Sequence, residues 1–305
     1  MDTRLQQLSY SSMLSLHSCP RAFQLYKLNS KTSEFEDIHQ SLTFLFGHTV
    51  GAGIQLLMEG NSYDNTLWKL FLAWDMDLFD LNPKQQKSFW HAMAALELFT
   101  ELRDSGFLAE YDLMYFNGKP ACELSFRIAL PNGFRYRGFV DAVLRNRETG
   151  EAVVLEIKTT SSSTSLNPAQ YKNSAQAIGY SIVLDHLFPG LSSYQVIYLP
   201  YLTKAREWQP AYYDKNHLQR ALWLQELLLD IQTIQLYENT GVYPMHGESC
   251  FSFYRECEYF NLCTLSIENL IKPASPETES KIAAETYDVE VTFEDLIQAQ
   301  LSKES

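Results

Sequence analysis

The chain has 305 residues, of which 46% are hydrophobic and 13% aromatic, so it can bury a sizeable core. Its formal net charge of −13 argues against a protein that binds nucleic acid through overall positive charge, although a local basic groove is compatible with it. No apolar stretch is long enough to span a bilayer, and the opening MDTRLQQLSYSS is not a secretory signal. We therefore expect a cytoplasmic location and no membrane partner.

The first hundred residues show helical patterns. Residues 9–30 predict two short helices with a break at Pro20, and residues 43–59 predict a helix that holds three glycines. Residues 63–105 predict two helices, broken near Asn82.

From residue 121 the pattern changes to strands. Residues 121–130 and 134–146 predict a β-hairpin around Pro131-Asn132-Gly133, and residues 151–160 predict a third, buried strand. The later predicted elements are a helix over 165–188, strands over 192–203 and 205–214, and a long helix over 217–238. This order predicts an α/β (α+β) fold built on one mixed central sheet.

The expected domain organisation is one domain over residues 1–271, with a helical insert at about 60–117. Cysteine-bearing segments lie around residue 19 and over 250–263. A polar tail, 272–305, shows no core pattern until a short predicted helix in TFEDLIQAQL.

Three charged residues on the predicted hairpin and third strand suggest a cation site. Asp141 lies within the apolar stretch GFVDAVL, where an isolated carboxylate is costly to bury. Glu156 and Lys158 share a face of the next strand, and antiparallel pairing can bring Asp141 close to Glu156. Two adjacent carboxylates suit Mg²⁺ or Mn²⁺, and a lysine beside such a metal suits phosphodiester hydrolysis. Taken alone, the triplet is more often a turn residue and a surface ion pair.

Asp141, followed after fourteen residues by Glu156-Ile157-Lys158, resembles the PD-(D/E)XK nuclease signature. The resemblance implies a restriction-endonuclease-like fold, in which Asp141, Glu156 and the Ile157 carbonyl hold the metal. It also implies that Lys158 orients the attacking water or stabilises charge on the phosphate.

Gln176 and Tyr180 are four residues apart and share a face of the predicted helix. Together they resemble the Q-x-x-x-Y motif of RecB-type nuclease domains, which implies that they position DNA or the metal shell. FGHTVGAGIQ resembles the G-x-x-x-H helix of this family, but Gly51 stands where the histidine is usual. His48 lies three residues earlier on roughly the same face, so it is the candidate for the catalytic and metal-binding role of that histidine. The spacing supports equally well an ordinary histidine on the helix surface.

Two further polar residues enter the same hypothesis. Gln55, one turn after Gly51, is another polar candidate on the helix. Glu123, on the strand before Asp141, is either a further carboxylate of the site or, as the more common case, a charge at a strand edge.

Three of the five cysteines lie in CFSFYRECEYFNLC, and Cys19 lies in Cys-Pro-Arg-x-Phe. These motifs resemble iron–sulfur RecB-type nucleases, such as AddB and the CRISPR-adaptation nucleases. The resemblance implies a [4Fe–4S] cluster on four thiolates, with Zn²⁺ as the alternative. The implied ligands are Cys19, Cys250, Cys257 and Cys263.

The cysteine spacing follows the family pattern in part. The last step, C-x₅-C, matches it, whereas Tyr254 stands where C-x₂-C would place the first cysteine of the trio, so Cys250 is the substitute. Cys122 stands apart on a strand and is expected to be a core residue.

Together these features predict a Mg²⁺- or Mn²⁺-dependent DNA nuclease, exonuclease-like on ends or single strands, with the cluster as a structural clamp. The alternative is a catalytically weak or inactive subunit of nuclease fold that binds DNA or assembles with other proteins. A standalone chain without helicase motifs resembles a bacteriophage nuclease in the host cytoplasm, with a recombination or helicase protein as partner. Candidate phosphate contacts are Arg21, Arg135, Arg137 and Lys172.

Overall fold

The structure is a computed structural model. It describes residues 2–28, 38–78, 87–161, 171–188, 190–252, 255–267, 270 and 285–304. The backbone divides into two compact units. The first unit comprises residues 1–35, 125–138 and 220–305, and the second comprises residues 36–124 and 139–219. No helix within the described ranges is long and apolar enough to cross a membrane.

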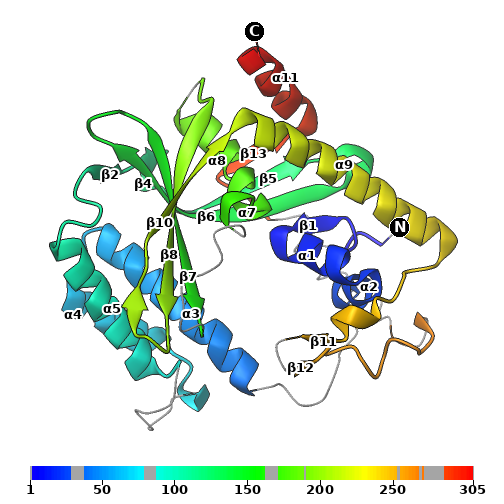
Figure 1. Cartoon of the computed structure of the whole chain (residues 1–305), viewed down its shortest axis with the longest axis horizontal. Helices are drawn as coiled ribbons and strands as arrows, with labels where there is room; N and C mark the ends of the chain where they lie inside the picture. Colours follow the sequence, from blue (N-terminus) through cyan, green and yellow to red (C-terminus); the bar gives the residue numbers. More distant parts are fainter. Residues whose placement is uncertain are drawn as a thin grey trace. The chain divides into compact units, whose positions relative to one another are not determined.

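A mixed sheet forms the centre of the fold (Figure 1), with strand order β10-β8-β7-β6-β5-β13. β7 pairs antiparallel with β6 and parallel with β8, and β10 pairs antiparallel with β8. This sheet confirms the predicted mixed α/β fold. The strands are β5 (Cys122–Ala129), β6 (Arg135–Asn146), β7 (Ala152–Thr160), β8 (Ser193–Leu202), β10 (Ala211–Asn216) and β13 (Val289–Thr292).

The second unit also contains helices, two short strands that join this sheet (β2 and β9), and a separate pair of strands (β3 and β4). They are α3 (Ile38–Met58), α4 (Tyr63–Ala73), η1 (Met76–Leu78), α5 (Phe89–Asp104), α7 (Ala175–Gly179), α8 (Ser181–Leu187), β2 (Tyr111–Leu113), β3 (Tyr115–Phe116), β4 (Lys119–Pro120) and β9 (Glu207–Trp208). Along α3, Phe46, Val50 and Ile54 recur every four residues, as expected for a helix with one buried face. They join one apolar core with Leu96 of α5 and Leu155 of β7.

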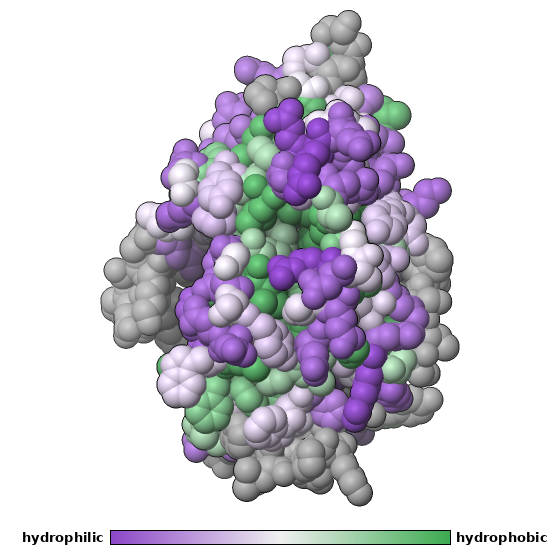
Figure 2. Space-filling model, turned by 90° about the vertical axis from the view of Figure 1, so that its left-hand side faces the viewer, coloured by the Kyte–Doolittle hydropathy of each residue, from purple (hydrophilic) through white to green (hydrophobic). Residues whose placement is uncertain are grey.

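Part of the surface of the second unit is apolar. Trp68 and Leu72 of α4 and Trp90 of α5 are all at least half exposed. Figure 2 shows green, hydrophobic residues between the purple, hydrophilic ones on one face of the molecule.

The first unit contains the two ends of the chain. Its helices and strands are β1 (Gln7–Ser9), α1 (Tyr10–Ser18), α2 (Pro20–Lys27), η2 (Pro131–Gly133), α9 (His217–Thr240, which starts in the second unit), η3 (Gly247–Ser249), β11 (Phe251–Ser252), β12 (Arg255–Glu256) and α11 (Phe293–Glu304). The predicted break at Pro20 is confirmed: Cys19 is extended, with φ −158°, and Pro20 begins α2. The helix predicted in the tail is α11.

The structure corrects the sequence predictions at two places. The described part of the helix predicted over 165–188 is two helices, because α7 ends at Gly179 and α8 begins at Ser181. Residues 162–170 lie outside the described residues, as does the break predicted near Asn82. β13 was not predicted, because VEVT pairs with β5 from far along the chain and alternates without a strong apolar face.

Gly53→Ala is expected to destabilise the protein by about 1–3 kcal/mol. A Cβ at this position of α3 would lie 2.5 Å from Leu96 Cδ1 and 3.0 Å from Leu70 Cδ1, inside the packed core. Gly51→Ala is the matched control, because a Cβ there meets nothing within 4 Å and alanine favours the helix by about 1 kcal/mol. Urea unfolding of the two variants should show opposite signs; equal shifts would contradict the packing described here.

Candidate active site

β6 and β7 bring Asp141 and Glu156 together. Their antiparallel register pairs Ala142 with Leu155, so Asp141 lies at the level of Glu156. The Asp141 Oδ2 atom accepts a hydrogen bond of 2.7 Å from the backbone N–H of Ile157. This contact fixes the aspartate across the strand pair and confirms the predicted proximity.

Glu156 connects the β7 motif with the helical motif. It is only 1% exposed. Its Oε1 atom forms an ion pair with Lys158 Nζ, and its Oε2 atom accepts a hydrogen bond from the hydroxyl of Tyr180. Lys158 Nζ also donates to Gln176 Oε1 at 2.9 Å. The side chains that the sequence singled out on β7 and after it therefore form one chain of contacts.

The electrostatics of this acidic pair favour a bound cation. Burial, and then the neighbouring charge of Glu156, raise the pKa of Asp141 well above its usual range, although Lys158 and the Ile157 N–H act in the opposite direction. A cation between the carboxylates would remove this penalty. Within the described part of the chain, no three His, Cys, Asp or Glu side chains converge as a metal-binding group. Two carboxylates with backbone and water oxygens nevertheless fit Mg²⁺, which keeps several of its waters in proteins.

Glu123 lies near Glu156, and His48 lies near Glu123. Glu123 has a φ of 50°, unusual within a strand, and desolvation followed by the charge of Glu156 raises the pKa of its carboxyl. His48 is exposed on α3, and its charge acts on Glu123 in the opposite direction. Gln55, by contrast, donates to Glu59, just after the end of α3, at 2.9 Å.

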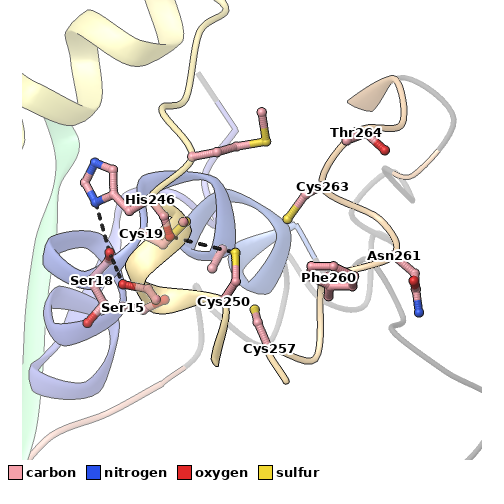
Figure 3. A pocket seen from close by; sticks show the side chains of 14 residues that line it. Ser15, Ser18, Cys19, His246, Cys250, Cys257, Phe260, Asn261, Cys263 and Thr264 are labelled. Carbon is pink, nitrogen blue, oxygen red and sulfur yellow. Dashed lines mark hydrogen bonds between the residues drawn. The ribbon is translucent and has the colours of Figure 1, made fainter. Parts of the chain in front are cut away.

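The four cysteines predicted as ligands line one cavity of about 460 Å³ in the first unit (Figure 3). Burial, and then the neighbouring Cys257, Cys19 and Cys250, raise the pKa of the Cys263 thiol. Cys122 is buried on β5 and does not line this cavity, as predicted. Tyr254 lies outside the described residues.

Arg21 connects α2 to the cysteine-rich segment. Its guanidinium donates to the carbonyls of Cys263 at 3.3 Å and Leu265 at 2.9 Å, and its backbone N–H donates to Pro244 O. Arg21 is 9% exposed, so it supports this segment rather than offering a phosphate contact as the sequence suggested.

A search against protein families matches residues 7–264 to the PD-(D/E)XK nuclease superfamily. The chain belongs to the PD-(D/E)XK nuclease superfamily. Solved structures similar to this PD-(D/E)XK chain include a candidate exonuclease from Eubacterium rectale, with 12% identity, a TM-score of 0.49 and coverage of 92% of this chain and 94% of the other. Another is SSO0001, with 16% identity, a TM-score of 0.31 and coverage of 73% and 84%. The search of curated proteins finds no match.

Lys215 supports the candidate site of this PD-(D/E)XK protein, and the sequence analysis missed it. The side chain is buried on β10, and Nζ donates to the carbonyls of Tyr171, at 2.6 Å, and Lys172. The Tyr198 hydroxyl also donates to Tyr171 O, at 3.2 Å. These bonds hold the residues that lead into α7, the helix that carries Gln176. Nothing in the local sequence YYDKNH distinguishes this lysine from a surface one.

The stability of the protein should depend on the ionisation of Lys215. Burial lowers its pKa from 10.5 to about 8. Between pH 8 and 10.5, Lys215 is protonated in the unfolded chain but largely neutral in the folded protein. Raising the pH through this window should therefore increase the free energy of unfolding of the wild type relative to that of Lys215→Met, by at most about 3 kcal/mol. Denaturant unfolding of both proteins across this pH window measures the difference. The same pH dependence in both would contradict the assignment.

Proposed function

We propose that this protein is a Mg²⁺- or Mn²⁺-dependent deoxyribonuclease that acts on DNA ends or single strands. The observation that carries the proposal is the chain of contacts that joins Asp141, Glu156, Lys158, Gln176 and Tyr180. In a member of the PD-(D/E)XK superfamily, two carboxylates beside a lysine suit metal-assisted phosphodiester hydrolysis.

Asp141, Glu156 and the carbonyl of Ile157 would hold the divalent cation, with His48 as a further candidate ligand. Such a cation supplies a polarised phosphate and a more acidic water molecule. Tyr180 orients the Glu156 carboxylate through its hydroxyl, and Gln176 holds the ammonium of Lys158. Lys158 is thereby placed to orient the attacking water or to stabilise negative charge on the phosphate.

The four thiols of the cysteine cavity are the donor set of an iron–sulfur cluster, with a zinc ion as the alternative. Four thiols line the cavity, and four thiolates are the ligand set of a [4Fe–4S] cluster. Zinc would draw all four sulfurs to about 2.3 Å from one point. A cluster is instead held at its corners, with one thiolate on each iron. We therefore include a structural cluster on Cys19, Cys250, Cys257 and Cys263 in the proposal.

A nuclease-fold subunit with little or no activity is the second candidate, and Gly51 is the observation that favours it. A Cβ at Gly51 would meet nothing within 4 Å, so packing does not exclude the side chain that related nucleases carry there. We also propose a bacteriophage origin and a recombination or helicase protein as partner. Both rest on the sequence resemblance.

A cleavage assay tests the function. End-labelled single- and double-stranded DNA would be incubated with the purified protein in Mg²⁺, Mn²⁺ or EDTA. We expect degradation with either metal and none with EDTA. Binding of DNA without cleavage in either metal would support the second candidate instead, and the absence of both activities would contradict the proposal.

A further inference from the structure

An acidic segment near the C-terminus lies along the edge of the sheet in the first unit. Residues 285–295, called the acidic segment below, carry five carboxylates and no basic residue. Within this segment β13 pairs in parallel with β5, with Val289 opposite Phe126 and Thr292 opposite Ala129.

The acidic segment neutralises two arginines on the sheet. Arg137 Nη1 of β6 lies 2.6 Å and 2.8 Å from the two carboxylate oxygens of Glu285. Arg127 Nη2 of β5 lies 2.7 Å from Glu290 Oε2. Tyr287 lies between these pairs: its hydroxyl donates to Glu285 at 2.5 Å, and the Arg127 guanidinium lies 5.1 Å from the centre of its ring.

Arg137 also acts on a neighbouring basic residue, Lys27. The charge of Arg137, together with a larger effect of burial, lowers the pKa of Lys27 to about 8. Burial disfavours the charged form of Arg137, but its bonds to Tyr287 and Glu285 outweigh this and raise its pKa. Arg137 therefore keeps its charge while it is paired with Glu285.

The two ion pairs that cover the arginines are weak enough to be exchanged, whereas β13 and the bonds between Asp288 and Ser125 keep the segment attached to β5. Both ion pairs are partly exposed, with side-chain exposures of 21% and 45% for Arg127 and Glu290, and exposed pairs contribute about 0–1 kcal/mol each. β13 is only four residues long, and Val289 is its one buried residue. An anion with several charges in a row could replace the carboxylates at little cost.

We propose that Arg127 and Arg137 form a phosphate-binding surface for single-stranded DNA, which the acidic segment occupies in competition with the DNA backbone. The guanidinium fork binds carboxylate and phosphate with the same geometry, so the carboxylates of Glu285 and Glu290 stand in for successive phosphates. The inference rests on the proposed nuclease function.

Binding of a fluorescent single-stranded oligonucleotide, measured by anisotropy in EDTA with the full-length protein, tests the proposal. Glu285→Gln should lower the Kd about threefold to tenfold, and Glu290→Gln should act in the same direction. Glu294→Gln is the matched control, because it removes the same charge from an exposed position of the same segment. It should have little effect.

Arg137→Gln supplies the second arm. It should raise the Kd, reduce the slope of log Kd against log salt by about 0.7, and abolish the effect of Glu285→Gln. Equal Kd values for Glu285→Gln and Glu294→Gln, or an unchanged salt slope for Arg137→Gln, would overturn the competition model. If either of these results were found while the wild type cleaved DNA normally with metal, only this inference would fail. A wild type that neither binds nor cleaves DNA would overturn the proposed function as well.

Discussion

Glu156→Gln is expected to reduce metal-dependent DNA cleavage by about a hundredfold to a thousandfold without unfolding the protein. The change removes one of the two carboxylates proposed to hold the cation. Glutamine has the same size and can still accept the hydrogen bond from Tyr180. Lys158 loses its ion pair but keeps Gln176 as an acceptor, and its side chain is 37% exposed.

Single-turnover cleavage in Mn²⁺ measures this effect, with circular dichroism as the test of folding. Glu148→Gln is the control, because Glu148 is an exposed turn residue. It should cleave as the wild type does. Similar rates for Glu156→Gln and the wild type would show that hydrolysis does not depend on this carboxylate.

Cys263→Ser is expected to have the largest effect on stability. A cluster joining Cys19 to Cys263 closes a very long loop, and by analogy with a disulfide its loss would lower the free energy of unfolding by on the order of 5 kcal/mol. The broad visible absorbance of an iron–sulfur cluster should disappear with it. Iron and sulfide analysis and thermal unfolding of the protein, purified without oxygen, measure both changes.

Cys122→Ala is the matched control for the cysteine prediction. Cys122 is buried on β5 but does not line the cavity, so the variant should keep its colour and its iron content. A colourless wild type with one zinc ion per chain would support the zinc alternative. A wild type that contains neither metal would contradict a role for the four thiols as ligands.

The core of the candidate site could be predicted because its signals are local. Asp141, Glu156 and Lys158 follow the two-residue period of their strands, and Gln176 and Tyr180 are one helical turn apart. The sequence Pro131-Asn132-Gly133 also predicted the turn after β5, and its last two residues take φ values of 61° and 79°.

The rest depends on contacts between residues far apart in the chain. Lys215 holds carbonyls 43 and 44 residues earlier, and Arg137 pairs with Glu285 148 residues later. The sequence suggested Arg137 as a phosphate contact but gave no sign of its carboxylate partner. The φ of 50° at Glu123 likewise reflects the strand's surroundings, since glutamate has no intrinsic preference for that conformation.

A crystal structure of the protein soaked in Mn²⁺, with the anomalous signal of the metal recorded, tests the central claim most directly. The proposed function predicts a Mn²⁺ peak bound by both Asp141 and Glu156, with the Ile157 carbonyl as a further ligand and Lys158 displaced from its ion pair. A well-ordered site in which Asp141 and Glu156 bind no Mn²⁺, in a protein that still cleaves DNA in the same buffer, would contradict it.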